Sequence, residues 1–127
     1  MSDTTTQGVR VQVNSYYVEE RSSPTNNLYF FAYKVVITNQ GDETVQLINR
    51  EWVITDFNGK VERVQGPGVV GEQPVLQPGE SFDYTSFCPL TTPFGSMEGH
   101  YEMILDNGST FKARIAPFSL SPPYAVN

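Results

Sequence analysis

The sequence has very few of the residues from which metal and redox sites are usually built. Cys88 is its only cysteine and His100 its only histidine. One cysteine excludes an intrachain disulfide and a multi-cysteine zinc site, and one histidine excludes a site with two imidazoles from a single chain. A chain without disulfides is typical of a reducing compartment. We therefore expect no bound cofactor.

Long apolar runs and clusters of basic residues are also absent. Residues 1–7 lack the basic and apolar regions of a signal peptide, and no apolar run approaches the ~18 residues that a membrane span needs. Eight Lys and Arg against fourteen Asp and Glu give a formal net charge of -6, and the basic residues are too scattered to neutralise a phosphate backbone. These features predict a cytoplasmic protein that binds neither a membrane nor nucleic acid.

What the sequence does contain is short stretches in which apolar and polar residues alternate between turn residues, a pattern typical of antiparallel strands. Over its 127 residues we expect one all-β domain, an immunoglobulin-like or fibronectin type III-like antiparallel sandwich of seven to eight strands. The predicted segments are a disordered N-terminus (1–7), the sandwich (8–120) and an extended tail (121–127). Strands are expected over 9–18, 28–39, 45–57, 61–64 and 82–86, and as a final hairpin of 99–105 and 110–118.

The strand over 45–57 changes phase along its length. Val45 and Leu47 lie in one phase and Trp52 in the other, which predicts a β-bulge near Asn49. Arg50 shares a face with Trp52, so a cation–π contact or an arginine-anchored recognition surface is one interpretation, and a structural role for Trp52 in the core is the other. Tyr101, near the start of a late strand, is a candidate for a tyrosine corner.

A glycine-rich segment follows the fourth predicted strand. Gly66-x-Gly68-x-x-Gly71 matches the dinucleotide-binding pattern, but no helix is expected after it and Pro67 removes an amide that a phosphate would use. A turn-rich crossing between strands, an anion-binding nest and a partner surface that exposes two valines remain open. The candidate partner- or anion-binding residues are Gly66, Gly68, Val69, Val70, Gly71 and Gln73.

Acidic residues alternate around the single histidine and could bind a ligand. Glu98, His100 and Glu102 share a strand face and form a weak candidate site for a divalent ion, with a solvated strand face as the alternative. Cys88 has no basic neighbours in sequence and is expected to be a partly buried structural thiol. No nucleophile motif accompanies these residues, so we expect no enzymatic activity.

Several stretches together resemble one family, the ApaG domain, in order and spacing. The stretches are residues 50–52 (REW), 64–74 (VQGPGVVGEQP), 76–79 (LQPG), 84–86 (YTS), 92–101 (TPFGSMEGHY) and 115–120 (IAPFSL). The resemblance implies a stand-alone bacterial member with a fibronectin type III-like sandwich. Related domains are attached to F-box proteins and to a DNA-polymerase-interacting protein, bacterial members are linked to cobalt resistance and magnesium efflux, and their genes lie beside a diadenosine polyphosphate hydrolase.

These observations favour a non-enzymatic module that recognises a protein partner through an edge strand or through the loops 66–74 and 89–95. The alternative is a sensor that binds a nucleotide, a diadenosine polyphosphate or a divalent ion at the glycine-rich loop. The resemblance supplies no catalytic residues. Exposed edge strands also make a homo-oligomer a further expectation to test.

Overall fold

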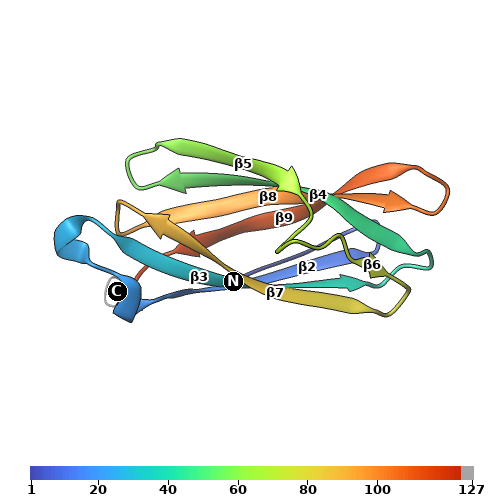
Figure 1. The fold of residues 1–127 in the computed structure, drawn as a ribbon, viewed down its shortest axis with the longest axis horizontal. Helices are drawn as coiled ribbons and strands as arrows, with labels where there is room; N and C mark the ends of the chain where they lie inside the picture. The colour runs from blue at the N-terminus through green and yellow to red at the C-terminus, as the bar shows by residue number, and fades with distance from the viewer. Residues whose placement is uncertain (124–127) are drawn as a thin grey trace.

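The computed structural model describes residues 1–123, which form two antiparallel β-sheets packed face to face (Figure 1). Two 3-10 helices of three residues each lie between the second and third strands. In chain order the elements are β1 (Ser2–Thr6), β2 (Val9–Tyr17), η1 (Glu19–Arg21), η2 (Pro24–Asn26), β3 (Tyr29–Asn39), β4 (Val45–Asp56), β5 (Val61–Pro67), β6 (Val75–Leu76), β7 (Ser81–Leu90), β8 (Gly95–Leu105) and β9 (Thr110–Leu120).

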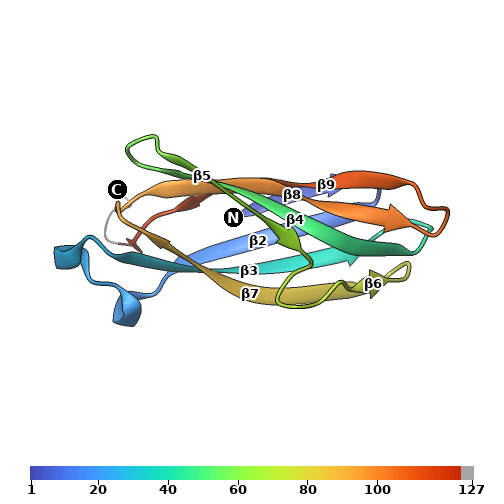
Figure 2. The same cartoon turned by 45° about the horizontal axis from the view of Figure 1, so that its top comes forward.

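The sheets have the strand orders β1-β2-β3-β7 and β5-β4-β8-β9, and the short β6 pairs with one end of β4. Figure 2 shows an elongated, flattened sandwich in which β7 forms one edge of its sheet. The all-β sandwich expected from the alternating pattern is confirmed. The described residues contain nine strands, because β1 and β6 add to those that the pattern predicts.

The core lies between the sheets and follows the alternation of the sequence. On β3 the side chains of Phe31, Tyr33, Val35 and Ile37 are buried, while Lys34 between them is exposed. Branched and aromatic side chains pack well on a pleated surface of which one face is buried. The same period-2 rule buries alternate residues on β2 and β9.

The N-terminal segment contradicts the prediction of disorder. Ser2–Thr6 forms β1, which pairs with β2 from Ser2 opposite Val13 to Thr6 opposite Val9. Arg10 also forms a bidentate ion pair with Asp3, at 2.6 and 2.9 Å. The segment was misread because β1 has no apolar residue in its pattern. Its order comes from ladder hydrogen bonds with β2, which residues 1–7 alone do not reveal.

The predicted β-bulge is present. Between β4 and β8 the register shifts between Leu47 and Asn49, so that Ile48 is the extra residue on β4. Leu47 before the bulge and Trp52 after it are both buried. The inserted residue reverses the phase of the strand, which turns Arg50 toward the inner face and Glu51 toward the outer face.

Turn positions agree with the sequence at both asparagine-glycine pairs. The backbone of Asp56 and Lys60 closes the β4–β5 turn, and that of Leu105 and Ser109 closes the β8–β9 turn. The predicted loop 89–95 is shorter than expected, because β7 extends to Leu90 and β8 begins at Gly95.

Within residues 1–123 no helix has the length and apolar character needed to cross a membrane. The predicted tail lies partly outside the described residues, and residues 121–123 belong to no strand.

Candidate functional site

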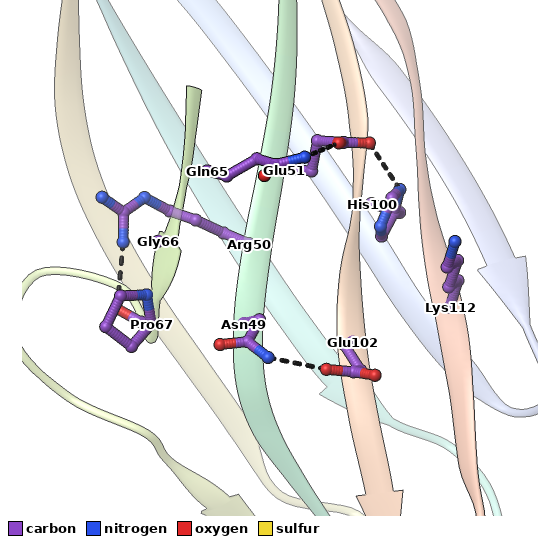
Figure 3. Close-up of a pocket in the computed structure, with 9 residues that line it drawn as sticks. All are labelled: Asn49, Arg50, Glu51, Gln65, Gly66, Pro67, His100, Glu102 and Lys112. Carbon is purple, nitrogen blue, oxygen red and sulfur yellow. Dashed lines mark hydrogen bonds and ion pairs between the residues drawn. The ribbon is translucent and has the colours of Figure 1, made fainter. Parts of the chain in front are cut away.

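A polar hollow of about 420 Å³ lies on the outer face of the second sheet, where β5, β4, β8 and β9 run side by side. Figure 3 shows its side chains and the bonds that join them. The strand registers explain why these residues meet, since Glu51 on β4 stands opposite both Gln65 on β5 and His100 on β8. The hollow is lined by Asn49, Arg50, Glu51, Gln65, Gly66, Pro67, His100, Glu102 and Lys112.

The carboxylates in the hollow already have partners from this chain. Glu51 accepts a hydrogen bond from Gln65 and lies 3.6 Å from Nδ1 of His100. The Gln65 hydrogen bond lowers the pKa of Glu51 below its ordinary value, and the positive charges nearby lower it further. Asn49 Nδ2 donates to Glu102 Oε1 at 2.6 Å. The hollow is therefore an internally bonded surface patch.

The weak metal site predicted at Glu98, His100 and Glu102 does not assemble. All three lie on the outer side of β8, but His100 faces Glu51 and Glu102 is held by Asn49. Among residues 1–123 no group of three potential ligands is close enough to hold a metal ion. Sharing a strand face places these side chains in a row, and a row does not converge on one point.

The glycine-rich segment forms the end of β5 and a tight turn. Val69 and Glu72 exchange backbone hydrogen bonds of 2.8 and 2.9 Å across Val70 and Gly71, which have φ values of 44° and 81°. Two successive positive φ values define a type I′ turn. No helix follows, so the dinucleotide-binding arrangement is not formed. The amides of Gly68, Val69 and Glu72 bond to carbonyls of this chain, which leaves few for an anion.

The valines of this turn have different environments. Val70 is 56% exposed, as the partner-surface interpretation requires, but Val69 is buried in the core and is not available to a partner. Gln73 anchors the segment, since its Nε2 donates to the carbonyl of Ile48 at 3.0 Å and its own carbonyl accepts from Gln46. The loop is thus ordered by side chains that bond to β4.

Arg50 supports the turn at Val70 through hydrogen bonds to the residues that precede it. Its Nη1 donates to the carbonyls of Pro67 and Gly68, each at 3.0 Å. Figure 3 shows the side chain passing Gly66 and pointing away from His100 and Lys112. A Cβ on Gly66 would lie 3.0 Å from the guanidinium nitrogens, so a larger residue there would require Arg50 to shift slightly.

Trp52 has the structural role that was one of its two interpretations. It is 3% exposed and its ring lies 5.2 Å from that of Tyr33 and 5.9 Å from that of Phe118. The only cation–π contacts in the described residues involve Arg21, so the contact proposed between Arg50 and Trp52 is not formed. The arginine-anchored surface remains open.

Tyr101 does not form the predicted tyrosine corner. Its hydroxyl is hydrogen-bonded to that of Tyr84 across the two sheets, where both side chains are buried, and no backbone group partners it among the described residues. Burial raises the pKa of each phenol well above the ordinary value of tyrosine, and the positive charge of Arg50 partly offsets this rise. Two hydroxyls that satisfy each other allow a polar pair to remain inside an apolar core.

Cys88 is the structural thiol that the sequence suggests. It is 4% exposed on the inner face of β7, and burial raises the pKa of its thiol to about 11. A thiol in this state is a poor nucleophile at neutral pH.

An aromatic surface on the outer face of the first sheet was missed by the sequence reasoning. The ring of Phe87 is 5.5 Å from that of Phe30, and the guanidinium of Arg21 lies 4.2 Å from the centre of the Phe30 ring. Phe87 is 51% exposed. Its position one residue before the buried Cys88 could have indicated an outward-facing aromatic residue.

The architecture and these surfaces define a small two-sheet β-sandwich domain, with ordered loops at one edge. Comparison with known proteins narrows this class, because the family model described as the ApaG domain matches residues 19–105. The chain belongs to the ApaG family.

Relatives agree over almost the whole chain. It is 54% identical to the protein ApaG of Beijerinckia indica, over 98% of this chain and 96% of that protein. It is 56% identical to the protein ApaG of Methylobacterium radiotolerans, over 94% of this chain and 92% of that protein. The crystal structure of an ApaA protein from Bordetella pertussis has a TM-score of 0.89 and 50% identity, and the match covers 91% of this chain and 94% of the other.

Proposed function

We propose that the chain is a non-catalytic binding module that recognises a protein partner through the edge strand β7 and the aromatic surface beside it. The observation that carries this proposal is the stack of Arg21, Phe30 and Phe87 on the outer face of the first sheet. Aromatic residues, phenylalanine included, and arginine are enriched at protein interfaces. An exposed aromatic residue on a strand at a sheet edge combines such an anchor with free backbone groups.

The backbone of β7 is available on one side. Among the described strands β7 pairs only with β3, so its other edge has unpaired ladder groups to which a partner strand can add. The turn at Val70 borders the same edge, since Val70 lines one cleft with Tyr84 and Ser86 of β7. The edge-strand and loop interpretations therefore describe one continuous surface.

We further propose that the protein acts in the cytoplasm and that any link to cobalt and magnesium homeostasis is indirect. The strongest ligand candidates, His100 and Glu102, already bond to Glu51 and Asn49. The effect on divalent cations would then depend on the bound partner. A second copy of the chain is a further candidate for the β7 edge, which sedimentation of the purified protein would reveal.

The test compares Phe87→Ser with Phe57→Ser in quantitative affinity capture from cytosol. Phe57 is a matched control because it is 68% exposed and its ring lies 5.4 Å from that of Phe94, at the β4–β5 turn. We expect Phe87→Ser to reduce capture of the specific partner at least tenfold, on the order of the loss of one hot spot. Phe57→Ser should capture as the parent does. Equal capture by both variants would refute recognition through this surface.

A further inference from the structure

Arg50 is a positive charge on the inner side of the sandwich for which the described chain provides no negative partner. The bulge at Ile48 turns it inward, beside Trp52 and opposite Tyr101 on β8. No carboxylate in residues 1–123 lies within ion-pair distance of its guanidinium. Arg50 is half-buried, so its guanidinium remains accessible to an anion from solution.

The hydrogen bonds of Arg50 leave part of the guanidinium unused. Nη1 donates to the carbonyls of Pro67 and Gly68. A guanidinium has five N–H donors in a fixed plane, so Nε and Nη2 keep their donors without a partner in the described chain. The two carbonyl bonds fix the plane, and the free edge is therefore held in one orientation.

Arg50 lines a cleft of about 260 Å³ that lies between β4 and β7 and beneath the turn at Val70. A second cleft of about 170 Å³ shares Tyr33, Arg50, Trp52 and Ser86 with it and reaches Cys88 and Met97. Aromatic rings form much of the wall, with the rings of Tyr33 and Trp52 5.2 Å apart. The first cleft is lined by Tyr33, Arg50, Trp52, Val69, Val70, Gly71, Tyr84 and Ser86.

We propose that this cleft binds a small organic carboxylate, which pairs with Arg50 and rests an apolar body against the small exposed parts of Tyr33, Trp52 and Tyr84. The guanidinium edge fits the two oxygens of a carboxylate, a pairing that gains strength away from water. Aromatic carbon from these side chains accounts for the apolar body, and Ser86, which is hydrogen-bonded to Tyr33, adds a hydroxyl. Ligand pockets commonly combine apolar walls with a few fixed polar groups. This site opens at the β7 edge used by the proposed partner surface, but it involves inward-facing side chains, whereas Phe30 and Phe87 lie on the outer face.

The chain contains its own reporter, because Trp52 is the only tryptophan and lines the cleft. The experiment titrates the full chain with phenylacetate and follows tryptophan fluorescence. Phenylacetamide, which has the same shape without the charge, is the ligand control. We expect a saturable change with phenylacetate and at least a tenfold weaker response to the amide. Equal responses to acid and amide would overturn the role of Arg50.

Two further probes ask whether the carboxylate belongs to a peptide terminus or to a free acid, and whether the site prefers a carboxylate to phosphate. N-acetylphenylalanine mimics the end of a peptide chain, so stronger binding of this probe would assign the site to a chain terminus, and stronger binding of phenylacetate to a free acid. Either result supports a carboxylate site. Binding of inorganic phosphate with no response to either acid would overturn it, as would the absence of any saturable response.

Substitutions in the cleft test whether the fluorescence response comes from binding at Arg50. Arg50→Gln should weaken phenylacetate binding at least tenfold, while Arg63→Gln, which removes the same charge from an exposed position on β5, should leave it unchanged. Because Arg50→Gln also loses a turn contact, Ser86→Leu serves as a second variant that fills the cleft and leaves Arg50 in place. Binding that survives both Arg50→Gln and Ser86→Leu would show that the site is elsewhere.

Discussion

The two long edges of the sandwich are closed in different ways. At one edge β9 packs against β1 and β2, and hydrogen bonds cross the gap from Ser15 Oγ to the Ser119 carbonyl at 2.7 Å and from the Arg114 amide to Thr6 Oγ1 at 3.2 Å. At the other edge β7 and β5 do not pair. The turn at Val70 lies beside Tyr84 and Ser86 of β7 at this gap, and Arg50 holds the residues before the turn by hydrogen bonds to Pro67 and Gly68.

The difference shows where a small sandwich can accommodate function. The closed edge is joined by direct contacts between strands of the two sheets. The open edge contains the clefts, the buried pair of Tyr84 and Tyr101 and the exposed Val70. Backbone edges, cavities and polar groups that would be costly inside a core are thus gathered at one side. Stability at the open edge should therefore depend on the aromatic core, the turn at Val70 and the buried thiol of Cys88.

The largest expected effect is at the aromatic core of the open edge. Trp52→Ala removes a side chain that is 3% exposed and packs on Tyr33 and Phe118, and should lower the free energy of unfolding by about 3–5 kcal/mol. Urea denaturation followed by circular dichroism measures this without the lost tryptophan. The exposed Phe57→Ala is the control and should change stability by about 0.5 kcal/mol or less. A Trp52 variant as stable as this control would show that the ring does not support the core.

The next effect concerns the turn that spans the open edge. In Gly68→Ala the new Cβ would lie 2.2 Å from the Glu72 carbonyl oxygen at a φ of 61°, so we expect a loss of roughly 2–3 kcal/mol. Gly71→Ala is the matched control, because its φ is 81° but nothing lies within 4 Å of the added Cβ. That variant should lose about 1 kcal/mol, from the backbone alone. Equal losses in urea denaturation would mean that the close approach of Gly68 to Glu72 is not rigid.

The smallest effect is a pH dependence that originates at Cys88. Burial raises the pKa of this thiol from 9.0 to about 11, so the folded state keeps a proton that the unfolded state loses. Stability from this group is complete below pH 9 and declines as the pH rises from 9 toward 11. Between pH 8 and 10.5 the parent should lose about 2 kcal/mol more than Cys88→Val. Parallel pH profiles for the two proteins would show that the thiol ionises freely in the fold.

The parts of the fold that follow local rules were predictable. Alternation located β2, β3 and β9, asparagine-glycine pairs located two turns, and the phase change in β4 located the bulge beside Asn49. These signals lie within a few residues of the features that they specify. The formation of β1 could not be predicted from local rules, because this threonine-rich segment becomes a strand only when it pairs with β2.

The candidate sites were harder to predict than the strands. The alternation placed Glu98, His100 and Glu102 on one face, but their actual partners come from β4. The hydroxyl pair of Tyr84 and Tyr101 joins residues on opposite sheets, so the spacing of the two residues along the chain does not predict it.

The sequence by itself determined the all-β class, most strand positions, the bulge and the glycines that the turn at Val70 requires, because each is encoded by neighbouring residues through strand periodicity and allowed φ values. Tertiary structure alone decided that Arg50 ends beside an aromatic cleft and that the stack of Arg21, Phe30 and Phe87 borders a free edge. Both arrangements join residues from strands far apart in the chain. They depend on strand pairing and sheet packing, which bring distant side chains together and which local patterns do not specify.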